Sequence, residues 1–329
     1  MRKNVLFLLV LAFGVSAVKA QQDPQFTQNM FNHMAVNPGY AGIKQAICAK
    51  MFYRQQWLGF SETIDGEEND VAPQTMLLSL NGKVNPLHGG LGLVVYKDKL
   101  GYEDNIGVKF GYSFHLPINN GTLGIGVMAG FLNKKIDFSK FSPIDVDPLL
   151  ASKQIEDDMV FDMSFGLFYD NPDKFYVGLS SNQLLQAKTE FATSNIISPK
   201  LKRHYYLTGG YNWQLNNPLF EIKPSLFVKS DFASTQLDVN ALLYYNNQFW
   251  GGLSYRISDA VAILLGASPF INSSNESLQK LKIGYSYDVT TSAMGGSGRS
   301  SGSHEVFIGY CFNIVAKSLP ESYRNVRFL

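Results

Sequence analysis

The sequence of 329 residues is poor in charged side chains and has only two cysteines. Asp, Glu, Lys and Arg make up 17% of it, whereas an ordinary soluble domain carries roughly 25%. The formal net charge is +1, so nothing favours nucleic acid or another polyanion as a partner. Two cysteines are too few for the framework of a disulfide-rich fold. The shortage of charge instead fits a chain that places much of its surface in lipid.

Long apolar runs are confined to the N-terminus. The best later run, 260–267, is far shorter than the ~20 residues of a membrane-spanning helix. At the N-terminus, two basic residues precede the apolar stretch 5–15, and Val18-Lys19-Ala20 is a small-residue cleavage site. These features predict a secretory signal peptide over 1–20, removed on export. The mature chain is therefore either a soluble exported protein or a barrel, because only helices and closed barrels span lipid.

Several segments alternate between apolar residues and small or polar ones. Ile106, Val108, Phe110, Tyr112 and Phe114 are separated by Gly, Lys and Ser, and two segments near the C-terminus repeat the pattern. A period of two puts successive side chains on opposite faces of a strand. Repeated over many segments of about ten residues, this pattern is typical of a transmembrane barrel. The sequence thus predicts an all-β fold, an antiparallel transmembrane outer-membrane β-barrel.

Turn residues divide the region 46–314 into about 14 strands. Asn119-Asn120-Gly121 and Asn171-Pro172-Asp173 are compact hairpin signals between alternating segments. Short connections mostly alternate with longer ones, as expected of bacterial barrels with short periplasmic turns and long extracellular loops. Two connections break this rule: the one at Ser258 is very short on the outer side, and 268–278 is long on the inner side. This topology predicts that both chain ends lie in the periplasm. The predicted strands are 46–54, 73–82, 88–97, 104–117, 120–132, 159–169, 173–181, 203–215, 219–230, 236–246, 248–257, 259–267, 279–288 and 303–314.

The two ends of the mature chain lie outside the alternating region. The segment 21–45 is rich in Gln and Asn, with embedded aromatic residues. We expect it to be a periplasmic segment that plugs the barrel, covers its periplasmic mouth or docks a partner. The tail 315–329 is basic and aromatic near its end. We expect it in the periplasm as well, as a second contact or as a disordered end.

The two cysteines occupy matching places in the predicted topology. Cys48 comes early in the first strand and Cys311 late in the last. Closing a barrel pairs these two strands antiparallel, so both cysteines lie near the periplasmic rim, on the face away from lipid. The hypothesis is a cross-strand disulfide, which an oxidising compartment would permit. The alternative is two unpaired thiols.

Catalytic and metal-binding patterns are missing from the sequence. The five histidines are scattered without metal-ligand spacing, and no Gly-x-Ser-x-Gly elbow occurs. Acidic residues cluster in two loops without EF-hand spacing. His304, beside Ser303 and Glu305, is the only candidate for a catalytic group at the outer rim, and it is weak. We expect no enzyme activity, no cofactor and no metal.

Motifs in the N-terminal third carry a resemblance to a known family. They are Gln22-Asp23-Pro24-Gln25-Phe26-Thr27-Gln28-Asn29-Met30-Phe31, Asn37-Pro38-Gly39-Tyr40-Ala41-Gly42 and Tyr53-Arg54-Gln55-Gln56-Trp57. The sequence resembles the PorP/SprF family of outer-membrane proteins in the type IX secretion and gliding-motility system of Bacteroidota. The resemblance covers essentially the whole mature chain. Gly39 stands where the family has Ala, and His33-Met34 stand where it more usually has Pro-Leu.

The resemblance implies a non-enzymatic barrel of the outer membrane. Such a barrel assists type IX secretion or surface anchoring of large adhesin-like cargo with type B C-terminal domains. The partners implied are outer-membrane lipid, periplasmic secretion or motility subunits and a peptidoglycan-binding lipoprotein. The alternative is an outer-membrane channel or transporter barrel for small or hydrophobic ligands, which would need a continuous polar path through the lumen.

The N-terminal motifs also give the candidate site for plugging or partner binding. Asn37-Pro38-Gly39 reads as a turn, since Pro fixes φ and Gly permits a positive φ. Phe26, Met30 and Phe31 could form an apolar patch that seals the lumen or packs on the inner rim. The candidate residues are Gln22, Asp23, Pro24, Gln25, Phe26, Met30, Phe31, Asn37, Pro38, Tyr40, Ala41, Gly42, Arg54 and Trp57.

Overall fold

A computed structural model describes residues 23–64, 67–141, 154–172, 174–191, 200–271, 281–292 and 300–313. The predicted signal peptide, Gln22 and the predicted tail 315–329 lie outside these residues. Within the described ranges, no helix is long and apolar enough to cross a membrane.

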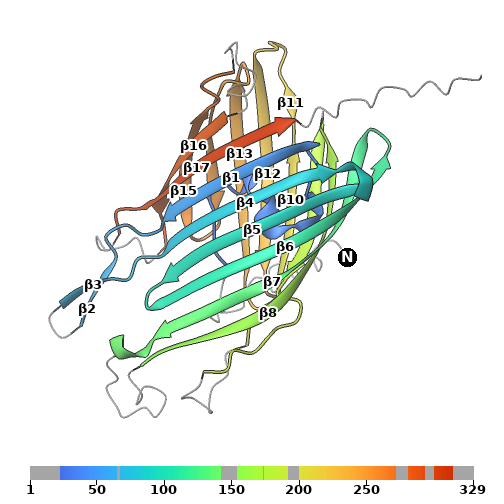
Figure 1. Cartoon of the computed structure of the whole chain (residues 1–329). Coiled ribbons are helices and arrows are strands. Elements are labelled where there is room, and N and C mark those ends of the chain that lie inside the picture. Colours follow the sequence, from blue (N-terminus) through green and yellow to red (C-terminus); the bar gives the residue numbers. More distant parts are fainter. Residues whose placement is uncertain are drawn as a thin grey trace, which may run out of the picture.

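The described residues form one closed antiparallel β-barrel (Figure 1). The ring closes where the first strand pairs with the last and where β10 pairs with β12. The sheet has fifteen strands, of which β10 and β11 follow one another along β12 and count as one, leaving fourteen. The strands are β1 (Ala46–Gln55), β4 (Gln74–Val84), β5 (Gly89–Leu100), β6 (Glu103–Ile118), β7 (Gly121–Asp137), β8 (Ile155–Asn171), β9 (Phe175–Asn182), β10 (His204–Tyr211), β11 (Trp213–Gln214), β12 (Phe220–Ser230), β13 (Thr235–Tyr245), β14 (Phe249–Arg256), β15 (Ala260–Ala267), β16 (Leu281–Thr290) and β17 (Ser303–Asn313).

The predicted barrel and its strand number are confirmed, with differences at the strand ends. The predicted strand 203–215 is interrupted at Asn212, between β10 and β11. β7 and β8 extend well beyond 120–132 and 159–169, because their charged ends continue the sheet past the apolar part of the wall. The hairpin of β2 (Ser61–Ile64) and β3 (Glu67–Asp70) was not predicted. Its residues are mostly polar and lack an apolar face.

The alternation separates two faces of the wall. Ile106, Val108 and Phe110 on β6 are 46%, 44% and 57% exposed on the outside, whereas Lys109 and Ser113 are buried. The outer face is therefore apolar along the middle of the strands. Such a band is the surface that a membrane barrel presents to lipid.

The lumen contains the N-terminal segment 23–45, which we call the plug. The plug includes three short helices, η1 (Asn29–Phe31), α2 (His33–Val36) and η2 (Pro38–Tyr40). Figure 1 shows these blue helices enclosed by the wall. Buried plug residues and inward-facing wall residues together make up the core of the molecule.

The plug runs along the barrel from one end to the other. Most of the long connections lie at one end, which we call the long-loop end, and β2–β3 projects from it (Figure 1). An exception is the connection between β15 and β16, which is long but lies at the opposite end. Asp23 bonds Gln183 and Tyr206 near this end. Lys44 pairs with Asp170 at the opposite, short-turn end, at 2.8 Å. The sequence leaves open whether this segment plugs the barrel, covers its periplasmic mouth or docks a partner. In the structure it lies in the lumen, because inward-facing polar groups bind it along its length.

Candidate functional site

Arg54 fixes the plug to the wall at the long-loop end. Its Nη1 donates to Thr27 Oγ1 at 2.7 Å, and its Nη2 donates to Asp288 Oδ2 at 2.8 Å. Nη1 also lies 3.2 Å from Glu305 Oε2. Glu305 in turn accepts the backbone N–H groups of Thr27 and Gln28, at 2.7 and 2.9 Å. Arg54 of β1, Asp288 of β16 and Glu305 of β17 thus connect three strands of the wall to the plug.

A second arginine extends this network. Arg256 Nε lies 3.3 Å from Asp238 Oδ1, and Arg256 Nη1 lies 3.4 Å from Asp288 Oδ2. Asp238 also accepts a bond from Asn29 of the plug at 3.3 Å. We call Arg54, Arg256, Asp238, Asp288 and Glu305 the charge cluster; all five are buried. The cluster holds two cations and three carboxylates, so the arginines do not neutralise every carboxylate. Hydrogen-bond donors of the plug bind Glu305 and Asp238 as well.

The middle of the plug contacts glycine residues of the barrel wall. A Cβ added to Gly124 or Gly126 would collide with the backbone of Pro38 and Gly39. Ser113 Oγ donates to the Gly39 carbonyl at 3.0 Å. The missing side chains therefore let the plug backbone lie directly against the wall.

The predicted turn at Asn37-Pro38-Gly39 is a short 3-10 helix, with Asn37 at its N-cap. Asn37 Oδ1 accepts the Gly39 N–H at 2.9 Å, and Asn37 Nδ2 donates to the Leu167 carbonyl at 2.9 Å. Gly42, rather than Gly39, has a positive φ, of 72°. Gly39 fits here because it is small: a Cβ at this position would lie only 2.8 Å from backbone atoms of the wall.

Aromatic side chains of the plug pack on the inner face. Phe26 packs edge-to-face on Phe52, with ring centroids 5.6 Å apart. Phe31 stacks on Phe307 at 5.0 Å and contacts Trp250 at 5.6 Å. The wall rings sit at inward positions of β1, β14 and β17. Both plug rings therefore bury their surface against the barrel interior.

His33 lies in an aromatic pocket at the centre of the lumen. Its ring is 5.2 Å from Tyr40, 5.2 Å from Phe168 and 4.7 Å from Tyr176. His33 is therefore enclosed by aromatic rings of both plug and wall.

Asp23 is ionised despite its burial. Burial raises the pKa of Asp23, but the charges of His204, Lys109 and Lys229 and the bond from the Tyr206 hydroxyl outweigh it, so that the pKa is lower than usual. Tyr206 donates to Asp23 Oδ2 at 2.6 Å. Lys229 Nζ donates to the Asp23 carbonyl at 2.9 Å. The first described residue of the plug is thus held by charge and hydrogen bonds.

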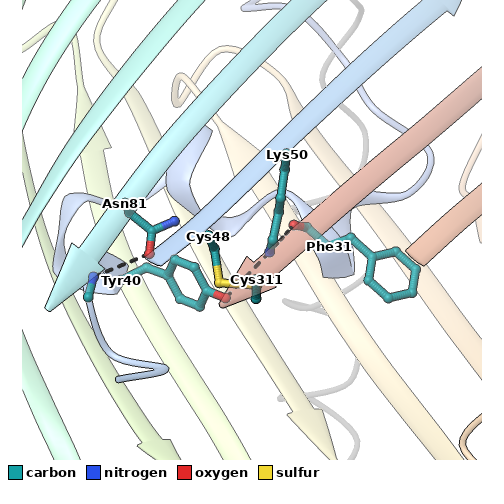
Figure 2. The surroundings of a disulfide bond; sticks show 7 residues. Phe31, Tyr40, Cys48, Lys50, Asn81 and Cys311 are labelled. Atoms are coloured by element: carbon teal, nitrogen blue, oxygen red, sulfur yellow. Dashed lines mark hydrogen bonds between the residues drawn. A yellow bond between two sulfur atoms is a disulfide. The ribbon is translucent and has the colours of Figure 1, made fainter. Parts of the chain in front are cut away.

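The two cysteines join the seam where the barrel closes. Cys48 and Cys311 face each other in the β1–β17 register, with Cα atoms 4.0 Å apart, and a disulfide connects them. Figure 2 shows plug contacts beside this bond. Lys50 Nζ donates to the Phe31 carbonyl at 2.7 Å, and Asn81 Oδ1 accepts from the Gly42 N–H at 3.3 Å. Strand β1, which the disulfide joins to β17, and its neighbour β4 therefore also hold the plug.

Reduction of this disulfide is expected to destabilise the barrel by about 2–4 kcal/mol, since a cross-link between distant residues restricts the unfolded chain. Urea unfolding in lipid bilayers, with and without reductant, measures the difference. The double variant Cys48→Ser with Cys311→Ser serves as the control, because reductant should not change its stability. A non-reducing peptide map with both thiols free would contradict the bond itself.

The structure brings most of the candidate residues together in the lumen. The plug and its wall contacts include Asp23, Pro24, Gln25, Phe26, Met30, Phe31, Asn37, Pro38, Tyr40, Ala41, Gly42 and Arg54. Trp57 is not part of this group. It lies beyond β1, where its N–H donates to Ser303 Oγ at 3.0 Å and its ring packs on Phe60.

Sequence reasoning missed the charged partners of the plug on the later strands. Asp238, Arg256 and Asp288 stand at inward positions of β13, β14 and β16, so the alternation marks each of them as facing the lumen. Which of them meet depends on the strand register. The described residues hold no group of three or more His, Cys, Asp or Glu side chains that could bind a metal ion.

The barrel is similar to several solved outer-membrane structures. The toluene transporter TbuX of Ralstonia pickettii has 10% identity and a TM-score of 0.49, covering 85% of this chain and 93% of that chain. A FadL homologue of Pseudomonas aeruginosa has 12% identity and a TM-score of 0.45, covering 84% and 92%. Omp33 of Acinetobacter baumannii has 10% identity and a TM-score of 0.42, covering 82% and 99%. Likeness at this level says nothing of what the chain binds.

No curated protein sequence matches the chain. The family described as "Type IX secretion system membrane protein PorP/SprF" matches residues 18–310. This range contains the plug, its wall contacts and nearly the whole barrel. The fold and the family together place the protein in the outer membrane. The chain therefore belongs to the PorP/SprF family of type IX secretion system membrane proteins.

Proposed function

We propose that the protein is a plugged, non-enzymatic outer-membrane anchor that assists secretion or surface anchoring of large adhesin-like cargo with type B C-terminal domains. The observation that carries this proposal is the plug, which bonds the wall at the charge cluster, along the glycines and beside the disulfide. Three cavities between plug and wall are small, about 20, 30 and 100 Å³. A lumen filled in this way suits a scaffold better than a conduit.

The proposed contacts with the machinery are at the short-turn end, which we assign to the periplasm. Membership of the secretion family supports an interaction with that machinery. Candidate partners are periplasmic secretion or motility subunits and a peptidoglycan-binding lipoprotein, with the tail 315–329 as a further contact. At this end the plug is held by Lys44 and by the bond of Asn81 to Gly42. A partner would therefore meet a surface made of both plug and wall.

Affinity purification of the protein from outer membranes tests this role. Secreted cargo and periplasmic lipoproteins are expected to co-purify. A matched control adds a large tag to the β2–β3 hairpin, on the opposite end, which should leave periplasmic partners bound. Recovery of the barrel alone, together with ion conductance through the unaltered protein, would favour the channel for small or hydrophobic ligands.

A further inference from the structure

Positive charge gathers at the short-turn end of the barrel. Among the described residues of this end, the only carboxylates are those of Asp170 and Glu221. The lysines of the same region are Lys44, Lys50, Lys83, Lys174, Lys223 and Lys282. The end that we assign to the periplasm is therefore basic.

Both carboxylates already have a lysine partner. Asp170 accepts from Lys44 of the plug at 2.8 Å. Glu221 pairs with Lys223 of β12 at 3.0 Å, and the Lys223 ammonium also lies 4.5 Å from the centre of the Tyr244 ring. Neither carboxylate is left over to neutralise the remaining lysines of the lumen.

Lys50 and Lys282 form no ion pair within the described residues. Lys50 Nζ donates to the carbonyl of Phe31, a neutral acceptor, at 2.7 Å, and an ammonium group has three donors in all. Lys282 is exposed on the inner face of β16. Glu221 attracts it, but Lys44 and Lys223 repel it. Two positive charges thus remain without a counter-charge of their own.

The strand register places these two lysines at the same level of the wall. Lys50 of β1 and Lys282 of β16 both pair with Gly309, from opposite sides of β17. Because neighbouring strands are about 4.8 Å apart, the two backbones are separated by roughly 10 Å. Gly309 has no side chain, and the Phe307 ring lies over it. Only apolar atoms of β17 therefore stand between the two ammonium groups.

The position and the charge of these lysines restrict what can bind them. They are on the inward face of the wall, so membrane lipid, which covers the outward face, does not reach them. The tail 315–329 has Lys317, Arg324 and Arg327 against Glu321 alone, so it adds positive charge instead of compensating it. Charge complementarity favours a carboxylate-rich segment of another protein.

We propose that the basic cluster, formed by Lys44, Lys50, Lys223 and Lys282, binds an acidic, extended segment of a periplasmic partner. Lys50 and Lys282 pair with two of its carboxylates. On one face of an extended chain, side chains recur about every 7 Å, a spacing that two long lysine side chains can match. The inference rests on the proposed function only in assigning the short-turn end to the periplasm, and it adds the chemistry by which a partner there is recognised.

Binding of a synthetic acidic peptide tests this site. The full-length protein is held in nanodiscs of phosphatidylcholine, which has no net charge. It is titrated at low salt into a peptide in which Glu alternates with Ser, labelled with a neutral fluorophore. A peptide with Gln in place of every Glu is the matched probe. We expect fluorescence anisotropy to show binding of the Glu peptide and about tenfold weaker binding, or none, of the Gln peptide, because hydrogen bonds between charged groups are the stronger ones.

Lys282→Gln should weaken binding of the Glu peptide about fivefold, the effect of losing one partly exposed ion pair. Lys174→Gln is the matched control. Lys174 is exposed at the same end of the barrel but stands beside β9, several strands away from β16. Its replacement removes the same charge and should leave binding unchanged.

Three results would overturn the proposal. Equal binding of the Glu and Gln peptides would show that carboxylates are not recognised. Equal losses in the two variants would reduce the attraction to net charge. Binding only after removal of 315–329 would assign the basic cluster to the chain's own tail. The comparison of the two peptides uses the unaltered protein, so it decides the matter even where Lys282→Gln does not assemble.

The co-purification experiment is read separately. Peptide binding without co-purifying cargo or lipoproteins would keep this site and remove the proposed role. Co-purifying partners without peptide binding would keep the role and remove this site.

Discussion

Replacing Arg54 with alanine is expected to lower the free energy of unfolding by about 3–5 kcal/mol, since removing one partner of a buried ion pair leaves the opposite charge uncompensated. Arg54 is 2% exposed and bonds both Asp288 and Glu305. Thr27 would lose its contact with the guanidinium as well, so the plug would be loosened together with the wall. Urea unfolding of the protein in lipid bilayers measures the loss.

Arg203→Ala is the matched control for this prediction. Arg203 also lies at the long-loop end, but the bond described for it is neutral, from Nη2 to the Leu184 carbonyl at 2.6 Å. Its replacement is expected to cost about 1 kcal/mol, as for an ordinary hydrogen bond. Arg54→Lys should fall between the two, because lysine keeps the charge but loses the planar fork. Equal losses for the two alanine variants would show that the charge cluster does not stabilise the barrel.

The strand number and the faces of the barrel could be predicted because lipid and lumen impose opposite demands. Val306 and Ile308 are exposed on the outer wall, whereas Glu305 and Phe307 are buried inside. The sequence shows this contrast as an alternation of apolar and polar or small residues with a period of two. The pairing of Cys48 with Cys311 follows from the same topology, since the first and last strands of a closed barrel must meet.

The state of the lumen could not be predicted in the same way. Inward positions such as Ser113 and Lys109 are polar or small whether they line water or contact a plug. The alternation is therefore the same for an open channel and for a filled one. The glycines at 124 and 126 are the feature that distinguishes the two, because they leave room for a second backbone. Their meaning becomes visible only once Gly39 is placed beside them.

The charge cluster depends on register, which the sequence does not fix. Arg54, Asp288 and Glu305 are far apart in the chain and meet because β1, β17 and β16 are neighbours. The β2–β3 hairpin was missed for the opposite reason: its short strands have no buried face, so no periodicity marks them. Sequence periodicity thus identifies a strand only where its two faces meet different environments, such as lipid and lumen. It does not identify a strand that has water on both faces.

Expelling the plug is expected to turn a silent barrel into a conducting one. Gly126→Leu would place a side chain where the Pro38 and Gly39 backbone now lies. The clash is with backbone atoms, which cannot move aside as the end of a flexible side chain can. Barrels of 16–18 strands leave an aqueous channel when their lumen is not filled, whereas those of about 8 strands fill it with side chains. A 14-strand wall with a polar inner face should conduct ions once the plug has left. Single-channel recordings in planar bilayers measure this.

The control for the conductance experiment is Gly209→Leu, which adds the same side chain to an outward position, where a Cβ would lie 3.8 Å from the nearest atom, the Tyr176 carbonyl oxygen. It should remain silent, as should the unaltered protein, whereas Gly126→Leu should show stepwise currents. Deletion of residues 22–42 gives an independent route to the same pore and also tests docking. If the deleted barrel folds and conducts but still binds its partners and displays cargo, the plug acts as a seal alone and the docking role is wrong. If neither variant conducts although both fold, the wall closes the lumen without the plug, and the seal is not its function.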